Sequence, residues 1–230
     1  YTLKKGETLT TPPLLYTYSN QGKGTVSRRF HRWARQYGVY NGTKPHMTLM
    51  NNWEATYFNF NNEILTGIID DAADMGFDLF LLDDGWFGKK HPRNSDNAGL
   101  GDWTINREKL PDGLGYLVKE CQKRNIKFGI WLEPEMVNPK SELYEKHPDW
   151  VITQPNRPLD LSRNQLVLDL CNPEVQDFVF SVVDKTMSET EDISYIKWDC
   201  NRFMTNAASS YLPADKQSHL WIEYVRGLYS

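Results

Sequence analysis

Short apolar segments alternate with amphipathic helical segments along most of this 230-residue chain. Most of the apolar runs are continuous, as expected of parallel strands that are covered on both faces. The segments between them carry apolar residues at helical spacing. This alternation predicts an α/β fold with a parallel sheet and right-handed crossovers. The expected strands are residues 47–50, 79–82, 126–131, 166–170 and 195–198.

Helices are expected between these strands, and their ends carry helix-boundary residues. Asn172 and Pro173 have the residue types of an N-cap and a first helical position. Gly38 and Gly76 are suited to ending a helix. Two adjacent prolines keep the first segment extended, so residues 1–24 are expected to be a connector and 25–230 the folded domain. The expected helices are 25–37, 63–75, 114–124 and 173–187.

Two architectures share such an alternation, an open doubly wound sheet and a closed (β/α)8 TIM barrel. No glycine-rich phosphate loop follows the first strand, which disfavours a nucleotide-binding open sheet. Polar or aromatic residues follow nearly every strand, and an active site that collects residues from many strand ends is typical of a barrel. Because five strands do not close a barrel, we expect the N-terminal part of one, with about five βα units and roughly the last three lacking.

The fifth apolar run has the most informative chemistry, because it ends in Lys197-Trp198-Asp199. Side chains alternate along a strand, so Lys197 and Asp199 share one face, and Ile196 and Trp198 share the other. A buried lysine and aspartate are costly unless they pair or serve a ligand. The cation lowers the pKa of the aspartate and keeps it ionised, as a nucleophile requires. A structural ion pair is the alternative, and it is less favoured at the carboxyl end of a barrel strand.

Asp83 and Asp84 end the second apolar run. Two adjacent carboxylates can accept hydrogen bonds from neighbouring hydroxyls of a sugar; helix capping and metal ligation are the alternatives. Trp53, Trp86 and Trp131 each lie near a strand end, where a tryptophan can stack on a sugar face, although a single tryptophan more often belongs to a core. The sequence therefore indicates a carbohydrate site only when these residues are taken together.

Two further groups of charged residues lie close to strand ends. Glu133 and Glu135 flank Pro134 after the third run, and one of them is expected to hold a lysine or arginine. Arg163 lies in a polar stretch before the fourth run. From the residues alone, a solvated loop charge is the favoured interpretation of Arg163.

Composition disfavours several classes of partner. The net charge is −4 and charges of both signs are mixed, which disfavours nucleic-acid binding. No apolar run has the length of a membrane span. Three cysteines make no disulfide framework and favour a cytoplasmic setting. The five histidines have no metal-ligand spacing, and we expect no cofactor and no metal.

Several long motifs, in order from about residue 12 to the end of the chain, resemble glycoside hydrolase family 36, the α-galactosidases or melibiases. They are NNWEATYF at 51–58, LDDGWFG at 82–88, LGDW at 100–103, WLEPEMV at 131–137 and KWDCNR at 197–202. The resemblance implies a (β/α)8 catalytic barrel. It also implies retaining double displacement, through a covalent galactosyl-enzyme, on α-galactosides such as melibiose and raffinose. It makes Asp199 the nucleophile and assigns substrate contacts to Trp53, Asp83, Asp84, Trp131, Arg163, Lys197 and Asn201.

The resemblance also implies parts that this sequence lacks. The family's acid/base is a second aspartate from a later strand region, and retaining hydrolysis needs two carboxyl groups about 5–5.5 Å apart. We therefore expect these 230 residues alone to be inactive. Family members carry a β-sandwich before the barrel, to which residues 1–24 would connect, and a small β domain after it. We expect the parent enzyme to be a homo-oligomer that acts on small-molecule substrates, without nucleic-acid or membrane partners.

Other functions remain compatible with the motifs. A transglycosidase, or a hydrolase of another α-sugar, would use the same scaffold and the same covalent intermediate. A non-catalytic carbohydrate-binding protein would keep the polar strand ends and lack the second acid. A metal-dependent barrel hydrolase would use Asp83, Asp84 and Asp199 as ligands.

Overall fold

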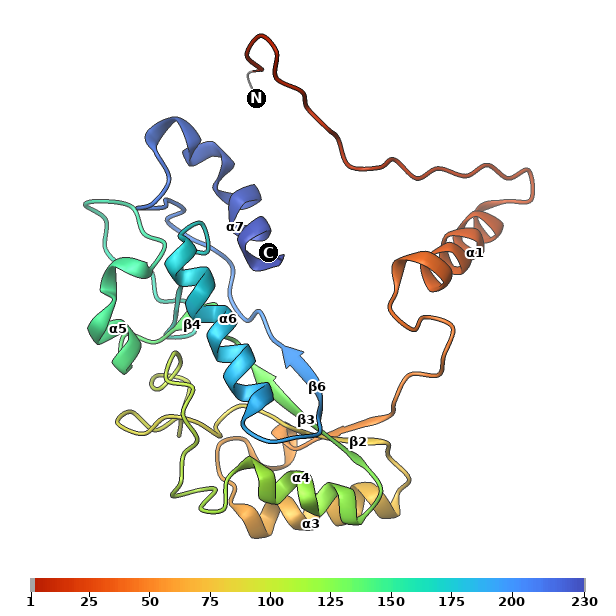
Figure 1. Cartoon of the computed structure of the whole chain (residues 1–230), viewed down its shortest axis with the longest axis vertical. Helices are drawn as coiled ribbons and strands as arrows, with labels where there is room; N and C mark the ends of the chain where they lie inside the picture. The colour runs from red at the N-terminus through yellow and green to blue at the C-terminus, as the bar shows by residue number, and fades with distance from the viewer. Residues whose placement is uncertain (1–2, 230) are drawn as a thin grey trace. The chain divides into compact units, whose positions relative to one another are not determined.

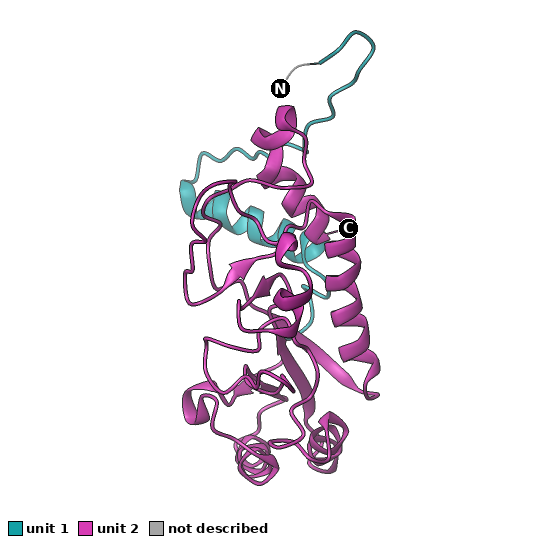
Figure 2. Ribbon diagram, turned by 90° about the vertical axis from the view of Figure 1, so that its left-hand side faces the viewer, with its two compact units in different colours: residues 1–46 teal, residues 47–230 magenta. Residues whose placement is uncertain are grey.

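The computed structural model describes residues 3–229 and has two compact units, residues 1–46 and 47–230 (Figure 2). In the first unit, residues 3–22 form no helix or strand. Helix α1 (Lys23–Trp33) follows, and the π-helical turn η1 (Ala34–Gly38) continues it. The helix expected at 25–37 is therefore confirmed, and its last turn is wider than an α-helix.

The second unit is built on a parallel sheet with strand order β1-β2-β3-β6 (Figure 1). Asn51 pairs with Leu81, and Leu132 pairs with Trp198, so the carboxyl ends of these strands lie along one edge of the sheet. The α/β class and the parallel sheet are confirmed. The four strands are β1 (Leu49–Asn51), β2 (Leu79–Leu82), β3 (Lys127–Leu132) and β6 (Ile193–Trp198).

The fourth predicted strand, 166–170, is not part of this sheet. Only β5 (Leu166–Val167) is a strand, and it pairs antiparallel with β4 (Met136–Val137). Strand β3 pairs directly with β6. The prediction that residues 166–170 form a parallel strand of the sheet, and with it the prediction of five βα units, is wrong. A buried apolar run has the same signature in a parallel strand and in a short antiparallel pair under a helix. Here the run packs in a second core with Val175 and Val179 of α6.

Three helices connect the strands as predicted: α3 (Asn62–Asp74), α4 (Leu114–Lys123) and α6 (Pro173–Ser188). Asn172 caps α6 by accepting a hydrogen bond from the Glu174 N–H at 3.0 Å, which confirms the predicted helix start. Helices α3 and α4 lie side by side (Figure 1) and share one apolar core with the sheet. The shorter elements are α2 (Trp53–Thr56), α5 (Glu142–Lys146), η2 (Pro148–Trp150), η3 (Ala214–His219) and α7 (Leu220–Tyr229).

The segment between β2 and α4, residues 83–113, carries most of an aromatic cluster. Phe87 stacks parallel to Trp131 with ring centroids 6.2 Å apart, and Trp103 lies 6.0 Å from the same indole. Trp86 donates from Nε1 to the Trp131 carbonyl at 3.0 Å. This segment thus packs on the end of β3 and buries Trp131. Over residues 3–229, every helix is too short or too polar to span a membrane.

Candidate active site

Lys197 joins two acidic side chains at the carboxyl ends of β2 and β6. Its Nζ lies 2.9 Å from Asp83 Oδ2 and 3.7 Å from Asp199 Oδ2. The prediction that Lys197 and Asp199 share a face is confirmed. Because the sheet is parallel, the two strand ends meet at one edge and one cation serves both carboxylates.

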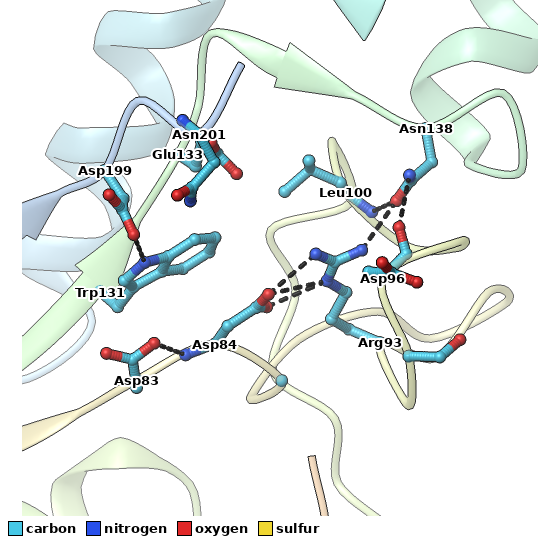
Figure 3. Close-up of polar contacts among 12 residues, drawn as sticks. Asp83, Asp84, Arg93, Asp96, Leu100, Trp131, Glu133, Asn138, Asp199 and Asn201 are labelled. Carbon is cyan, nitrogen blue, oxygen red and sulfur yellow. Dashed lines mark hydrogen bonds and ion pairs between the residues drawn. The ribbon is translucent and has the colours of Figure 1, made fainter. Parts of the chain in front are cut away.

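Asp199 is held from two sides and remains accessible. Trp131 donates from Nε1 to Asp199 Oδ2 at 3.0 Å (Figure 3), and the Asp199 N–H donates to the Leu132 carbonyl at 2.9 Å. Burial by itself raises the pKa of Asp199, but hydrogen bonds from Trp131 and Asn201 and the charge of Lys197 lower it below the ordinary value. The side chain keeps 32% of its exposure. Asp199 is therefore an ionised and reachable carboxylate, which can act as a nucleophile.

Asp83 is more enclosed than Asp199. Its Oδ2 accepts hydrogen bonds from Asn51 Nδ2 and from Lys197, and its Oδ1 accepts from the Asp84 N–H at 2.8 Å. Its own N–H donates to Asn52 Oδ1 at 2.8 Å. The side chain is only 4% exposed. The end of β1 thus fixes Asp83, which can offer a sugar only its remaining lone pairs.

Asp84 has a different cation, Arg93. The guanidinium donates from Nε to Asp84 Oδ1 at 3.0 Å and from Nη2 to Oδ2 at 2.8 Å, as Figure 3 shows. Its Nη1 donates to Asn138 Oδ1 at 3.0 Å. Burial raises the pKa of Asp84, and the Arg93 charge opposes that shift. The sequence does not predict this role of Arg93, because a loop arginine near Lys89 and Lys90 has the pattern of a solvated charge.

Lys109 is a half-buried cation of the site that no sequence pattern predicts. Its Nζ donates to the carbonyls of Phe58, Gly85 and Arg93 at 2.8, 2.9 and 3.1 Å. Burial lowers its pKa to about 8. Gly85 itself has φ 107°, and a Cβ there would lie 3.0 Å from Phe58. Lys109 and Gly85 together fix the turn that directly follows Asp84.

Glu133 and Glu135 lie after β3 and are buried, with 1% and 2% exposure. Glu133 Oε1 accepts from the Asn201 N–H, and Glu135 Oε2 accepts from Trp198 Nε1, each at 2.7 Å. Burial is the main cause that raises the pKa of Glu133 to about 8 and that of Glu135 to about 7. Within residues 3–229 neither forms an ion pair, so the expectation that one of them holds a lysine or arginine is not met there.

The tryptophans predicted for the site have different environments. Trp53 is half-buried and lines a hollow of about 420 Å³ together with Asn51 and Lys197. Trp131 is 1% exposed, and its contact with the site is the hydrogen bond from Nε1 to Asp199. Trp86 is buried in the aromatic cluster. Of the three, only Trp53 lines the hollow.

The last two predicted residues lie apart from each other. Asn201 is half-buried next to Asp199, and its N–H meets Glu133. Arg163 is exposed, has φ 54° and sits in a turn that a bridge between Ser162 and Gln165 closes. The structure does not bring Arg163 to the other site residues. Among the described residues, no group of three or more His, Cys, Asp or Glu side chains is arranged to hold a metal ion.

Comparison with known proteins gives consistent matches. The melibiase family matches residues 8–230. α-Galactosidase AgaA of Geobacillus stearothermophilus is 44% identical over 99% of this chain and 31% of its own length. Probable α-galactosidase C of Aspergillus flavus is 43% identical over 99% of this chain and 30% of its own length.

The solved structures agree with these matches. The crystal structure of an AgaA variant with 1-deoxygalactonojirimycin has a TM-score of 0.87 at 43% identity, over 92% of this chain and 29% of that one. Other AgaA variants were solved with raffinose and with stachyose. This chain spans about a third of the length of the curated relatives it matches.

Proposed function

This chain belongs to the melibiase family, and from this premise we propose that the protein containing it is an α-galactosidase, which removes terminal α-galactosyl residues from oligosaccharides. The relatives' names support the activity. The complexes of AgaA variants with raffinose and stachyose support small α-galactosides as substrates. The four parallel strands would be half of an eight-stranded barrel whose other strands lie outside this chain.

The observation that carries the proposal is the environment of Asp199. Its carboxylate has a lowered pKa, an indole hydrogen bond and a neighbouring ammonium, and it keeps a third of its exposure. In the proposed reaction this carboxylate bonds to the anomeric carbon while the bond to the leaving oxygen breaks, and an acid protonates that oxygen. Water then attacks the anomeric carbon and gives a proton to the deprotonated acid as the bond to Asp199 breaks, which restores both groups with net retention of configuration.

The neighbouring residues would bind and orient the galactosyl ring. Asp83 and Asp84 are fixed carboxylates whose free lone pairs can accept hydrogen bonds from sugar hydroxyls. Lys197 can donate to a hydroxyl while it holds Asp199 ionised. Trp53 lies on the wall of the hollow, where its ring can pack against the C–H face of a sugar. Asn201 and Arg163 are included among the proposed substrate-binding residues on the family resemblance alone.

We further propose that these 230 residues are inactive without the rest of the protein. Asp83 and Glu133 are buried, with 3% and 1% exposure, so neither carboxyl group is accessible to protonate a leaving group. The family resemblance implies an acid/base aspartate from a later strand, which would come from outside this chain and supply the second carboxyl group of a retaining reaction.

The test is a comparison of the full-length protein with its Asp199→Ala variant on an aryl α-galactoside, with an aryl α-glucoside as the sugar control. Loss of the nucleophile should lower kcat by at least ~10³-fold. Asp184→Ala, on the exposed side of α6, is the matched control and should keep the activity. If Asp199→Ala retains most of the activity, Asp199 is structural and the proposed mechanism is wrong. If the wild type cleaves only the glucoside, the sugar class is wrong.

A further inference from the structure

The end of β3 carries two buried acids without a counterion. Asp83 and Asp84, at the end of β2, each pair with a cation. Glu133 and Glu135 are at least as buried, yet no Lys, Arg or His nitrogen in the described part of the chain lies within ion-pair distance of either. An isolated buried carboxylate is so costly that it takes up a proton instead.

The groups that face Glu133 favour its uncharged form. Glu135 faces it from the same turn, Asp84 from the end of β2, and Asp199 and Cys200 from the segment after β6. All four are acids, and none supplies a positive charge. Ionised Glu133 would therefore stand among other negative charges in a site from which water is largely excluded. Burial accordingly raises the pKa of Glu133 to about 8.

The contacts of Glu133 lead directly to the proposed nucleophile. Its Oε1 accepts from the Asn201 N–H at 2.7 Å, and Asn201 lies two residues beyond Asp199, whose pKa the Asn201 side chain helps to lower. The neighbouring Asp199 N–H donates to the Leu132 carbonyl. Two hydrogen bonds thus hold the segment 199–201 against Leu132 and Glu133, which are consecutive residues at the end of β3. In Figure 3, Glu133 and Asn201 lie close together on the Asp199 side of Trp131. The carbonyl oxygen of a neutral carboxylic acid can accept this hydrogen bond as a carboxylate does.

We propose that Glu133 is a positioning residue for Asp199: as an uncharged acid it holds Asn201, and through Asn201 the nucleophile, without placing a second negative charge beside it. This inference rests on the proposed function, in which Asp199 attacks the sugar. It predicts that the accepting oxygen at position 133 is needed and that the negative charge is not.

The test is a set of three substitutions at one position, made in the full-length protein and assayed at pH 6 on an aryl α-galactoside. Glu133→Gln keeps an accepting oxygen at the same reach and has no charge. Glu133→Asp keeps the acid but is one methylene too short to reach Asn201, and Glu133→Leu has neither. We expect Asp and Leu to lower kcat by on the order of 10²-fold through misplacement of Asp199, and Gln by less than about tenfold.

An activity-independent measurement tests the charge state. Because the pKa of folded Glu133 is raised from 4.5, its contribution to stability is complete below pH 4.5 and is lost as pH rises to about 8. In urea titrations, the free energy of unfolding of Glu133→Gln should therefore fall less steeply between pH 4.5 and 8 than that of the wild type. Glu120→Gln is the matched control, because Glu120 pairs with Lys123 and Arg124 and its pKa is lowered. The stability that Glu120 contributes changes with pH only below pH 4.5, so this variant should not alter the slope between pH 4.5 and 8.

Each outcome decides one point. The inference is overturned if Glu133→Asp is more active than Glu133→Gln, because then the charge matters. It is also overturned if Glu133→Gln loses as much as Glu133→Leu, or if none of the three variants folds, because then the role is structural. If Glu133→Leu alone fails to fold, the comparison of Gln with Asp carries the test. A wild-type protein that does not cleave the galactoside contradicts the proposed function instead, and the urea titrations still test the charge state.

Discussion

The ends of strands β2 and β3 each carry two acidic residues, but only the pair at the β2 end has cationic partners among the described residues. At the β2 end, Asp83 and Asp84 are ion-paired with Lys197 and Arg93. At the β3 end, Glu133 and Glu135 accept hydrogen bonds from a backbone N–H and an indole, and no cation is paired with them in residues 3–229. Both pairs are buried. The cations from elsewhere in the chain, and not the acids themselves, decide which pair has counterions.

In the proposed function, this difference would separate two tasks at one edge of the sheet. Ionised acids that are held by cations can accept hydrogen bonds from sugar hydroxyls and remain in place. Uncharged acids can hold a neighbouring segment without changing the field at Asp199. If all five carboxyl groups were charged, Lys197, Arg93 and Lys109 would not balance them, and Asp199 would be harder to keep ionised.

The largest effect should come from making the β2 end resemble the β3 end. Arg93→Met leaves Asp84 buried without its guanidinium, which is 3% exposed in the ion pair. We expect the free energy of unfolding to fall by about 3–5 kcal/mol, because an uncompensated buried charge remains. Urea titration of the full-length protein measures this loss. Adding Asp84→Asn to the same protein should recover part of it, because that change removes the charge.

The control for this prediction is Arg124→Met. Arg124 is 22% exposed and pairs with Asp70 and Glu120 just before β3, at the opposite end of that strand. A partly exposed pair contributes about 0–1 kcal/mol. If Arg93→Met costs no more than Arg124→Met, the Arg93–Asp84 pair is not the compensated buried pair described above.

A smaller effect should follow from removing the cation that the β2 and β6 ends share. Lys197 is one of the causes that lower the pKa of Asp199. Lys197→Met should raise that pKa, so the acid limb of the kcat/KM profile should move to higher pH. Activity then falls more at pH 5 than at pH 7. Lys185→Met, exposed on α6, is the control. A uniform loss across pH would mean that Lys197 acts only through binding.

The sequence predicts where these acidic residues lie better than it predicts their charge state. Local rules suffice for Lys197 and Asp199, because the period of a strand places them on one face. The position of Asp83 and Asp84 at a strand end follows equally from the apolar run before them. The charge state of these acids does not follow, because it depends on Arg93 and on Lys197, which lie elsewhere in the chain. Partners brought together by a loop leave no periodic signal.

The same limit explains the wrong strand. Residues 166–170 are apolar except for Asp169, and burial under α6 and burial in the parallel sheet select the same apolar residue types. Leu166 and Val167 pair instead with Met136 and Val137, which follow the turn after β3 and form an antiparallel partner strand. Lys109 was missed for a related reason: its three carbonyl partners belong to three separate segments.

The smallest effect should come from neutralising the β3 end at pH 5, because burial raises the pKa of both of its acids above that pH. Glu135 is faced by Trp198, Asp199, Cys200 and, from α7, Tyr224, and none of these is a cation. Burial raises its pKa to about 7 from 4.5, so its contribution to stability is complete below pH 4.5 and is lost as pH rises to about 7. Glu135→Gln at pH 5 should change the free energy of unfolding by less than about 1 kcal/mol.

Asp84→Asn is the matched comparison, because it makes the same chemical change at the β2 end. There the amide leaves Arg93 without a counterion, and the cost at pH 5 should exceed that of Glu135→Gln by at least about 1–3 kcal/mol. Urea titrations of both variants at the same pH measure the difference directly. Equal costs would mean that Glu135 is ionised in the folded protein. In that case a cation from outside this chain must reach it, and the contrast between the two strand ends would hold only for Glu133.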